Sequence, residues 1–200
     1  MCDLLADRDA DLKAIIDQHG YPPMWSRPNI FQTLILTILE QQVSLASAYA
    51  AYKKLKDKTG FVTPQKILAL SAEELRACYF SRQKTVYAKE LATAIVKKKI
   101  NLKKLSFASD DDVRNILKEV KGIGDWTVDI YLIHALQRTD LFPLGDVALV
   151  NSLKETKRLD KNVTKAEMLA VAELWRPYRT IATMILWHHY IKKRGLKIQG

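Results

Sequence analysis

Two features of the sequence place residues where they could do chemistry. The stretch VKGIGDWT at residues 120–127 holds two closely spaced glycines, and the later stretch FPLGD ends at Asp146. Glycine permits positive φ and the close approach of another group, and N–H groups at the start of a helix suit a phosphate oxygen. A carboxylate at the start of a helix is kept ionised by the helix dipole, which suits it to stabilise a cation or activate water.

Helical segments flank the two glycines. Apolar residues recur with helical spacing in residues 110–120 and again in residues 125–137, so we expect two helices joined by a short turn. A dinucleotide-binding glycine loop is excluded, because it requires a preceding strand and a third glycine where Thr127 stands. A plain turn between two helices remains the alternative reading of Gly122 and Gly124.

The rest of the chain also shows helical patterns and few credible strands, which predicts an all-α protein of about ten helices. Capping signals are expected at Asn29 and Ser44, and capping boxes at Ser71 and Thr164. Further helices are expected at residues 3–18, 30–42 and 146–156, and from Pro177 to Lys193.

Composition narrows the class of protein. The chain has 200 residues and a net charge of +10, which favours a polyanionic partner such as nucleic acid. Cys2 and Cys78 are the only cysteines, which excludes a four-cysteine iron–sulfur site and a cysteine-rich zinc site, and the histidines show no metal spacing. There is no signal peptide and no apolar run long enough for a membrane span. We therefore expect a cytoplasmic protein, nucleoid-associated in a bacterium or nuclear in a eukaryote.

The double-glycine turn followed by Asp146 resembles the helix-hairpin-helix DNA glycosylase superfamily, and within it the 3-methyladenine DNA glycosylase II (alkylbase) branch. The resemblance runs from about residue 30 to the end. It implies a two-lobed all-α fold with the active site in the cleft between the lobes. Residues 30–120 would form a contiguous helical-barrel lobe, and residues 1–29 with 121–200 the second lobe. The hairpin at residues 113–137 would lie at their junction.

The same resemblance assigns the catalytic role to Asp146. Asp146 could otherwise be an ordinary helix N-cap, although capping and catalysis are compatible. Asp140 is the nearest rival, but it lies before Pro143, whereas the family's acid follows a proline-containing loop.

Aromatic residues are the candidates for a base pocket. Trp126 stands where glycosylase/lyase relatives carry a Schiff-base lysine, so the resemblance implies hydrolysis by water. Trp126 and Trp187 would flank an extruded base, and electron-rich rings suit a cationic alkylated purine. Trp25 is a weaker pocket candidate. Packing in the core is the alternative reading for all three.

The resemblance also assigns contacts with the DNA. The hairpin residues Gly122, Ile123, Gly124 and Thr127 would hold the DNA backbone without reading its sequence. Gln41 and Gln42 would fill the gap left by a flipped nucleotide, with Gln42 where the best-known relatives have a leucine. Both glutamines could instead be exposed residues at a helix end.

These expectations define a monomeric DNA repair enzyme that flips out and hydrolytically excises alkylated purines, such as 3-methyladenine and 7-methylguanine, from duplex DNA. No cofactor is implied, apart from a monovalent cation at hairpin carbonyls that the resemblance allows. The alternative is a non-catalytic helix-hairpin-helix protein that binds damaged DNA. A mismatch adenine glycosylase is opposed by the missing cysteines and by Thr37, where that branch places an acid.

Overall fold

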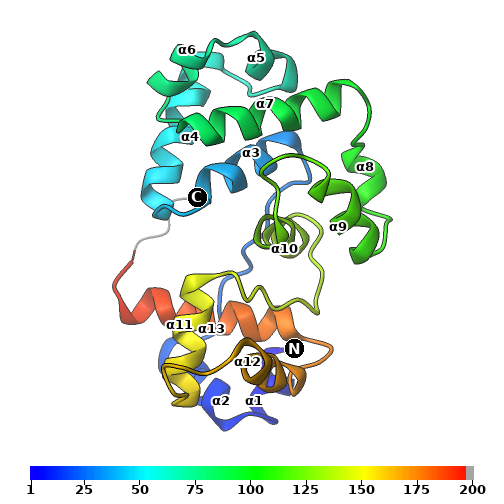
Figure 1. Ribbon diagram of the computed structural model, residues 1–200. Coiled ribbons are helices and arrows are strands. Elements are labelled where there is room, and N and C mark those ends of the chain that lie inside the picture. The colour runs from blue at the N-terminus through cyan, green and yellow to red at the C-terminus, as the bar shows by residue number, and fades with distance from the viewer. Residues whose placement is uncertain (197–200) are drawn as a thin grey trace. The chain divides into compact units, whose positions relative to one another are not determined.

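The computed structural model describes residues 1–196, in which every regular element is a helix and no strand occurs (Figure 1). The all-α class expected from the sequence is therefore confirmed. The chain divides into two compact units. We call residues 27–136 the middle unit, and residues 1–26 with residues 137–196 the terminal unit.

The middle unit is built around α3, whose side chains Leu34, Ile35 and Ile38 are fully buried. Helices α4, α7 and α10 all pack against α3. The helices of this unit are α3 (Phe31–Glu40), α4 (Leu45–Thr59), α5 (Pro64–Ala69), α6 (Ala72–Ala77), α7 (Arg82–Val96), α8 (Leu102–Leu105), α9 (Asp110–Lys118) and α10 (Asp125–His134).

The terminal unit is built around α13, which packs against α1, α2 and α11. Its helices are α1 (Cys2–Ala6), α2 (Ala10–His19), α11 (Val147–Lys157), α12 (Lys165–Glu173) and α13 (Arg179–Lys193). Asp9 joins the beginning of the chain to this unit. Its carboxylate caps α2 and also accepts hydrogen bonds from Trp175 Nε1 (2.7 Å) and Lys157 Nζ (2.6 Å).

The boundary between the units differs from the expected lobes. We expected the second lobe to resume at residue 121, whereas the middle unit continues to Leu136. The reason is that α9 and α10 pack against each other and α10 packs against α3, so both hairpin helices belong to the middle unit.

Most predicted helix starts are confirmed. Ser44 accepts a hydrogen bond from the backbone N–H of Ser47, and Ser71 and Thr164 both form complete capping boxes. Helix α11 begins after its N-cap Asp146, as the sequence predicts.

Three local expectations were wrong. The single helix expected at residues 3–18 is two helices, because Asp9 leaves the helical conformation to cap α2. Asn29 does not cap α3, because its side chain bonds to the Leu102 carbonyl and to the Tyr131 hydroxyl. The last helix begins at Arg179 rather than Pro177.

Among the described residues, no helix is both long enough and apolar enough to cross a membrane.

Candidate functional site

Asp146 lies at the N-terminus of α11, where a tight loop delivers it. The backbone N–H of Asp146 donates to the Pro143 carbonyl (2.9 Å), which closes the loop before the helix. The Asp146 Oδ1 atom then accepts a hydrogen bond from the backbone N–H of Leu149 (2.8 Å). The carboxylate therefore caps the helix, at the end where the helix dipole favours negative charge.

Trp187 on α13 is the second donor to the same carboxylate oxygen. Its indole Nε1–H donates to Asp146 Oδ1 over 3.0 Å, and the residue is only 8 % exposed. Ser152 on α11 donates to the Leu186 carbonyl (2.7 Å), which joins the two helices beside this contact. Two donors on one oxygen hold the plane of the carboxylate, and hydrogen bonds to an ionised acceptor are the stronger kind.

Trp25 and three histidines extend the region around Trp187. The rings of Trp25 and Trp187 meet edge to face at 6.4 Å, and His188 lies at the same distance on Trp25. His188 Nε2 lies 3.1 Å from the His19 carbonyl oxygen, and His19 Nε2 lies 3.1 Å from His189 Nδ1. Burial lowers the pKa of both His19 and His189. Sequence patterns could not predict this cluster, because its members come from segments far apart in the chain.

Asp140, the rival acid, has a structural role. Burial opposes its ionisation, but hydrogen bonds from Arg179 prevail and hold the pKa of Asp140 below its usual range. The Arg179 Nε–H donates to Asp140 Oδ1 (2.8 Å), and Arg176 forms a further ion pair with the same carboxylate. Asp140 therefore serves to join the loop before α11 to the start of α13.

The hairpin of α9 and α10 is closed by two ion pairs. Arg114 on α9 bonds to Asp129 on α10, and burial raises the pKa of Asp129 despite this partner. Nearer the turn, Lys118 Nζ bonds to Asp125 (2.6 Å). The two ion pairs connect α9 and α10 at different points along the helices. They therefore restrain the relative position of the two helices and the conformation of the turn between them.

The two glycines of the turn differ in whether the fold itself requires glycine. Gly122 has a φ of +91°, and an added Cβ would lie 2.0 Å from Cγ of Tyr87 on α7. Gly124 has an ordinary φ of −104°, and an added Cβ would meet no atom within 4 Å. The fold itself therefore requires glycine at 122. At 124 the open space lies outside the protein, at the N-terminus of α10, where no side chain caps the helix.

The predicted DNA contacts are only partly available. The side chains of Ile123 (4 % exposed) and Thr127 (2 % exposed) are buried, so these residues can offer a ligand only backbone groups. The Gln41 amide donates to the Gly122 carbonyl (2.8 Å) and to Thr127 Oγ1 (2.9 Å), inside the middle unit. The N–H donors of the Gln41 amide are therefore used within the protein, and contact of Gln41 with DNA stays a prediction. Gln42 is exposed and adopts a left-handed φ of 57°.

Trp126 is half-buried on the first turn of α10, in the middle unit. The other two pocket candidates, Trp25 and Trp187, touch each other in the terminal unit. The predicted site residues thus form two groups, one around Asp146 and one around the hairpin.

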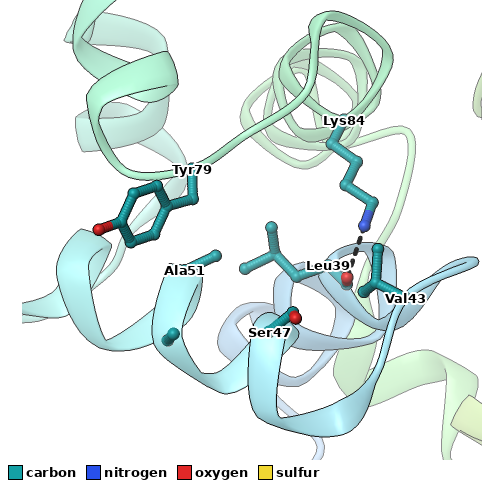
Figure 2. A pocket seen from close by; sticks show the side chains of 7 residues that line it. Leu39, Val43, Ser47, Ala51, Tyr79 and Lys84 are labelled. Atoms are coloured by element: carbon teal, nitrogen blue, oxygen red, sulfur yellow. Dashed lines mark hydrogen bonds between the residues drawn. The ribbon is translucent and has the colours of Figure 1, made fainter.

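A pocket that the sequence did not predict lies in the middle unit, between residues of α3, α4 and α7 (Figure 2). Its volume is about 280 Å³, and it is lined by Leu39, Val43, Ser47, Ala50, Ala51, Tyr79 and Lys84. Lys84 Nζ donates to the Leu39 carbonyl at the end of α3 (2.7 Å), and burial lowers the pKa of Lys84. The lining is mostly apolar, with one ammonium group at its edge.

Two carbonyl groups of the hairpin turn accept hydrogen bonds within the protein. The Gly122 carbonyl accepts the Gln41 amide, and the Val120 carbonyl accepts the Ile123 N–H (3.0 Å). Over residues 1–196 there is also no group of three His, Cys, Asp or Glu side chains placed to hold a metal ion.

Comparison with known families now gives the arrangement a context. The model of the HhH-GPD superfamily of base excision DNA repair proteins matches residues 35–177, which include the hairpin and Asp146. The chain belongs to this superfamily. Its relatives in sequence and in structure include proteins that are named 3-methyladenine DNA glycosylases.

Two relatives illustrate the similarity in sequence. A Bacillus subtilis protein, provisionally named a DNA-3-methyladenine glycosylase, is 32% identical over 88% of this chain and 64% of its own length. DNA-3-methyladenine glycosylase 1 of Schizosaccharomyces pombe is 33% identical over 78% of this chain and 71% of its own length. The chain thus spans about two thirds of the length of these HhH-GPD relatives.

Solved structures of other proteins are also similar to this chain. The Schizosaccharomyces pombe 3-methyladenine DNA glycosylase in complex with abasic DNA matches with a TM-score of 0.85 and 30% identity. That match covers 96% of this chain and 95% of the other. A DNA-3-methyladenine glycosidase from Bacillus halodurans matches with a TM-score of 0.75 and 27% identity, over 94% and 88% of the two chains.

Proposed function

We propose that this protein is a DNA N-glycosylase that hydrolytically removes alkylated purines of the 3-methyladenine and 7-methylguanine type from duplex DNA. The observation that carries the proposal is the Asp146 carboxylate, held at the N-terminus of α11 by the Leu149 and Trp187 N–H groups. The HhH-GPD membership and the names of the relatives support the choice of reaction and substrate.

The main role proposed for Asp146 is electrostatic stabilisation of the sugar. As the bond between the base and C1′ of the sugar breaks, positive charge develops on the sugar, and a carboxylate nearby stabilises that charge. Water then adds to C1′ and loses a proton, which an ionised carboxylate can orient or accept. An alkylated purine carries a positive charge and leaves as a neutral base, so the reaction needs no strong general acid.

A lyase step is not part of the proposal. Such a step needs a lysine amine that attacks the sugar, and this chain has Trp126 where the resemblance to the glycosylase/lyase proteins would place that lysine. Trp126 is half-buried on α10, where its ring can supply an aromatic wall but no nucleophile. The strand should therefore remain intact after base release.

The hairpin supplies the hold on DNA in this proposal. The first turn of α10 has no capping side chain, its N-cap Gly124 is exposed, and Lys121 lies beside it on the surface. Such a helix start favours a phosphate, and a net charge of +10 favours the polyanion as a whole.

Base release from methylated duplex DNA tests the proposal. Wild type is compared with Asp146→Asn, and with Asp57→Asn as a control that removes an exposed carboxylate from α4. We expect free 3-methyladenine or 7-methylguanine from wild type and the control but not from Asp146→Asn, with strands cut only after alkali. If wild type binds the DNA tightly and releases no base, the protein is a damage-binding protein and the proposal is wrong.

A further inference from the structure

Gln41 uses both N–H groups of its side-chain amide inside the middle unit. Nε2 lies 2.8 Å from the Gly122 carbonyl oxygen and 2.9 Å from Thr127 Oγ1. Gly122 belongs to the hairpin turn, and Thr127 is buried in the first turn of α10. One side chain therefore connects the end of α3 to both sides of the hairpin junction.

The backbone around Gln41 leads directly to an exposed side chain. Gln41 is the C-cap of α3, with φ of −59° and ψ of 121°, and so leaves the helical conformation. Gln42 follows with a left-handed φ of 57° and is exposed. Holding the Gln41 side chain thus limits where the Gln42 side chain can lie relative to the hairpin.

The hairpin turn is held from a second side. The ring of Tyr87 lies directly against the α-carbon of Gly122, where an added Cβ would be 2.0 Å from the ring. The Gly122 carbonyl accepts the Gln41 amide. With the ring against its α-carbon and the amide on its oxygen, Gly122 has little freedom to rotate.

We infer that Gln41 is a positioning residue, which sets the spacing between the hairpin that holds the DNA backbone and the Gln42 side chain that enters the duplex. The inference rests on the proposed function. It assigns Gln41 no contact with bases, because its amide donors are used within the protein. Removing those donors should leave binding to intact duplex nearly unchanged and weaken the state in which a nucleotide is displaced.

The experiment uses the full chain and a duplex with a tetrahydrofuran abasic analogue next to 2-aminopurine, whose fluorescence rises when its stacking is disturbed. The variants are Gln41→Met, which keeps the length and loses the donors, and Thr127→Val, which removes one acceptor. Both are made singly and together, and Thr127→Ser is the control that keeps the hydroxyl. Each variant is also made in a Gln42→Ala background.

We expect Gln41→Met to weaken binding to the abasic-analogue duplex about tenfold and to reduce the fluorescence change, with less than about a twofold change on intact duplex. The double variant should be little worse than Gln41→Met alone, because the two residues share one interaction. Thr127→Ser should behave as wild type. In the Gln42→Ala background, Gln41→Met should have no further effect on fluorescence. A purely structural defect would instead reduce the fluorescence change in both backgrounds.

Other outcomes overturn the inference. Additive effects of Gln41→Met and Thr127→Val would show that the two residues act independently, and an equal loss on intact and abasic-analogue DNA would show that Gln41 supports binding in general rather than the displaced state; either result would contradict the inference. Wild-type behaviour of Gln41→Met, or no fluorescence change with wild type, would remove the positioning role altogether. Since the readout needs no base release, failure of the proposed glycosylase activity is recorded separately. If Gln41→Met does not fold, Thr127→Val carries the same comparison.

Discussion

The region around Asp146 and the hairpin differ in which groups are proposed to act: a side-chain carboxylate in the first region and backbone groups in the second. At Asp146, the backbone N–H of Leu149 and the Trp187 side chain, which comes from the distant helix α13, hold a carboxylate. At the hairpin, backbone groups are proposed to bind the DNA, and neighbouring side chains such as Tyr87 and Gln41 restrain the conformation of that backbone. Substitutions around Asp146 should therefore lower the rate of base release, whereas substitutions at the hairpin should lower the stability of the protein or its affinity for DNA.

The largest effect should come from Gly122→Ala. The new methyl group would collide with the Tyr87 ring, at a φ of +91° that side chains rarely adopt. We expect a loss of about 3 kcal/mol in the free energy of unfolding, measured by urea denaturation. Gly122→Ala combined with Tyr87→Ala should recover the part due to the collision. A loss below about 1 kcal/mol would contradict the tight packing at this turn.

Trp187→Phe should have the next largest effect, which should be on the rate of base release. The change keeps an aromatic ring and removes the N–H that donates to Asp146 Oδ1. We expect the single-turnover rate of base release to fall about tenfold or more, since hydrogen bonds to charged groups contribute about 1.5–3 kcal/mol. DNA affinity should stay unchanged.

Trp175→Phe is the matched control for that prediction. It removes another buried indole N–H of the terminal unit, which donates to Asp9 (2.7 Å) rather than to Asp146. This control should lower stability and leave the rate of base release of the folded protein near that of wild type. Equal rate losses in both variants would mean that the Trp187 bond has no special role.

Gly124→Ala should separate affinity from stability at the hairpin. An added Cβ there meets no protein atom, so the free energy of unfolding should change by less than about 0.5 kcal/mol. The same Cβ would occupy space that a phosphate needs, so DNA affinity should fall about fivefold. Binding titrations at two salt concentrations measure this, and unchanged affinity would place the DNA backbone elsewhere.

The smallest effect concerns pH at the histidine cluster. Burial lowers the pKa of His19 and His189 below the ordinary value of 6.5, so the unfolded chain takes up protons first as the pH falls. Their contribution to stability is present above about pH 6.5 and is lost as the pH falls towards the lower folded-state pKa.

Urea denaturation at pH 7.5 and pH 5.5 checks this expectation. His189→Gln should lose less stability than wild type between the two pH values, because one of the groups that take up a proton is gone. An identical pH dependence in wild type and variant would show that the cluster does not contribute. His188 also belongs to the cluster and is left unchanged in both proteins.

Sequence reasoning reached those parts of the molecule that depend on local patterns. The hairpin helices, the capping boxes and the position of Asp146 at a helix start all follow from spacing within a few residues. The residues that contact these features could not be predicted from local spacing. The Trp187 hydrogen bond, the contact of Tyr87 with Gly122 and the histidine cluster all join segments far apart in the sequence. Gln41 shows the limit most clearly, since a polar residue at a helix end has the same appearance in sequence whether it faces solvent or the interior.

The two-segment construction of the terminal unit has a consequence for how the protein is made. Asp9 finds Lys157 and Trp175 only after most of the chain has been synthesised, whereas the middle unit is one continuous segment. Because domains fold as units while the chain emerges from the ribosome, the middle unit can form first. Helices α1 and α2 are synthesised before the middle unit, whereas their packing partners α11 and α13 are synthesised after it, so the contact surfaces of α1 and α2 stay uncovered until α11 and α13 have been made.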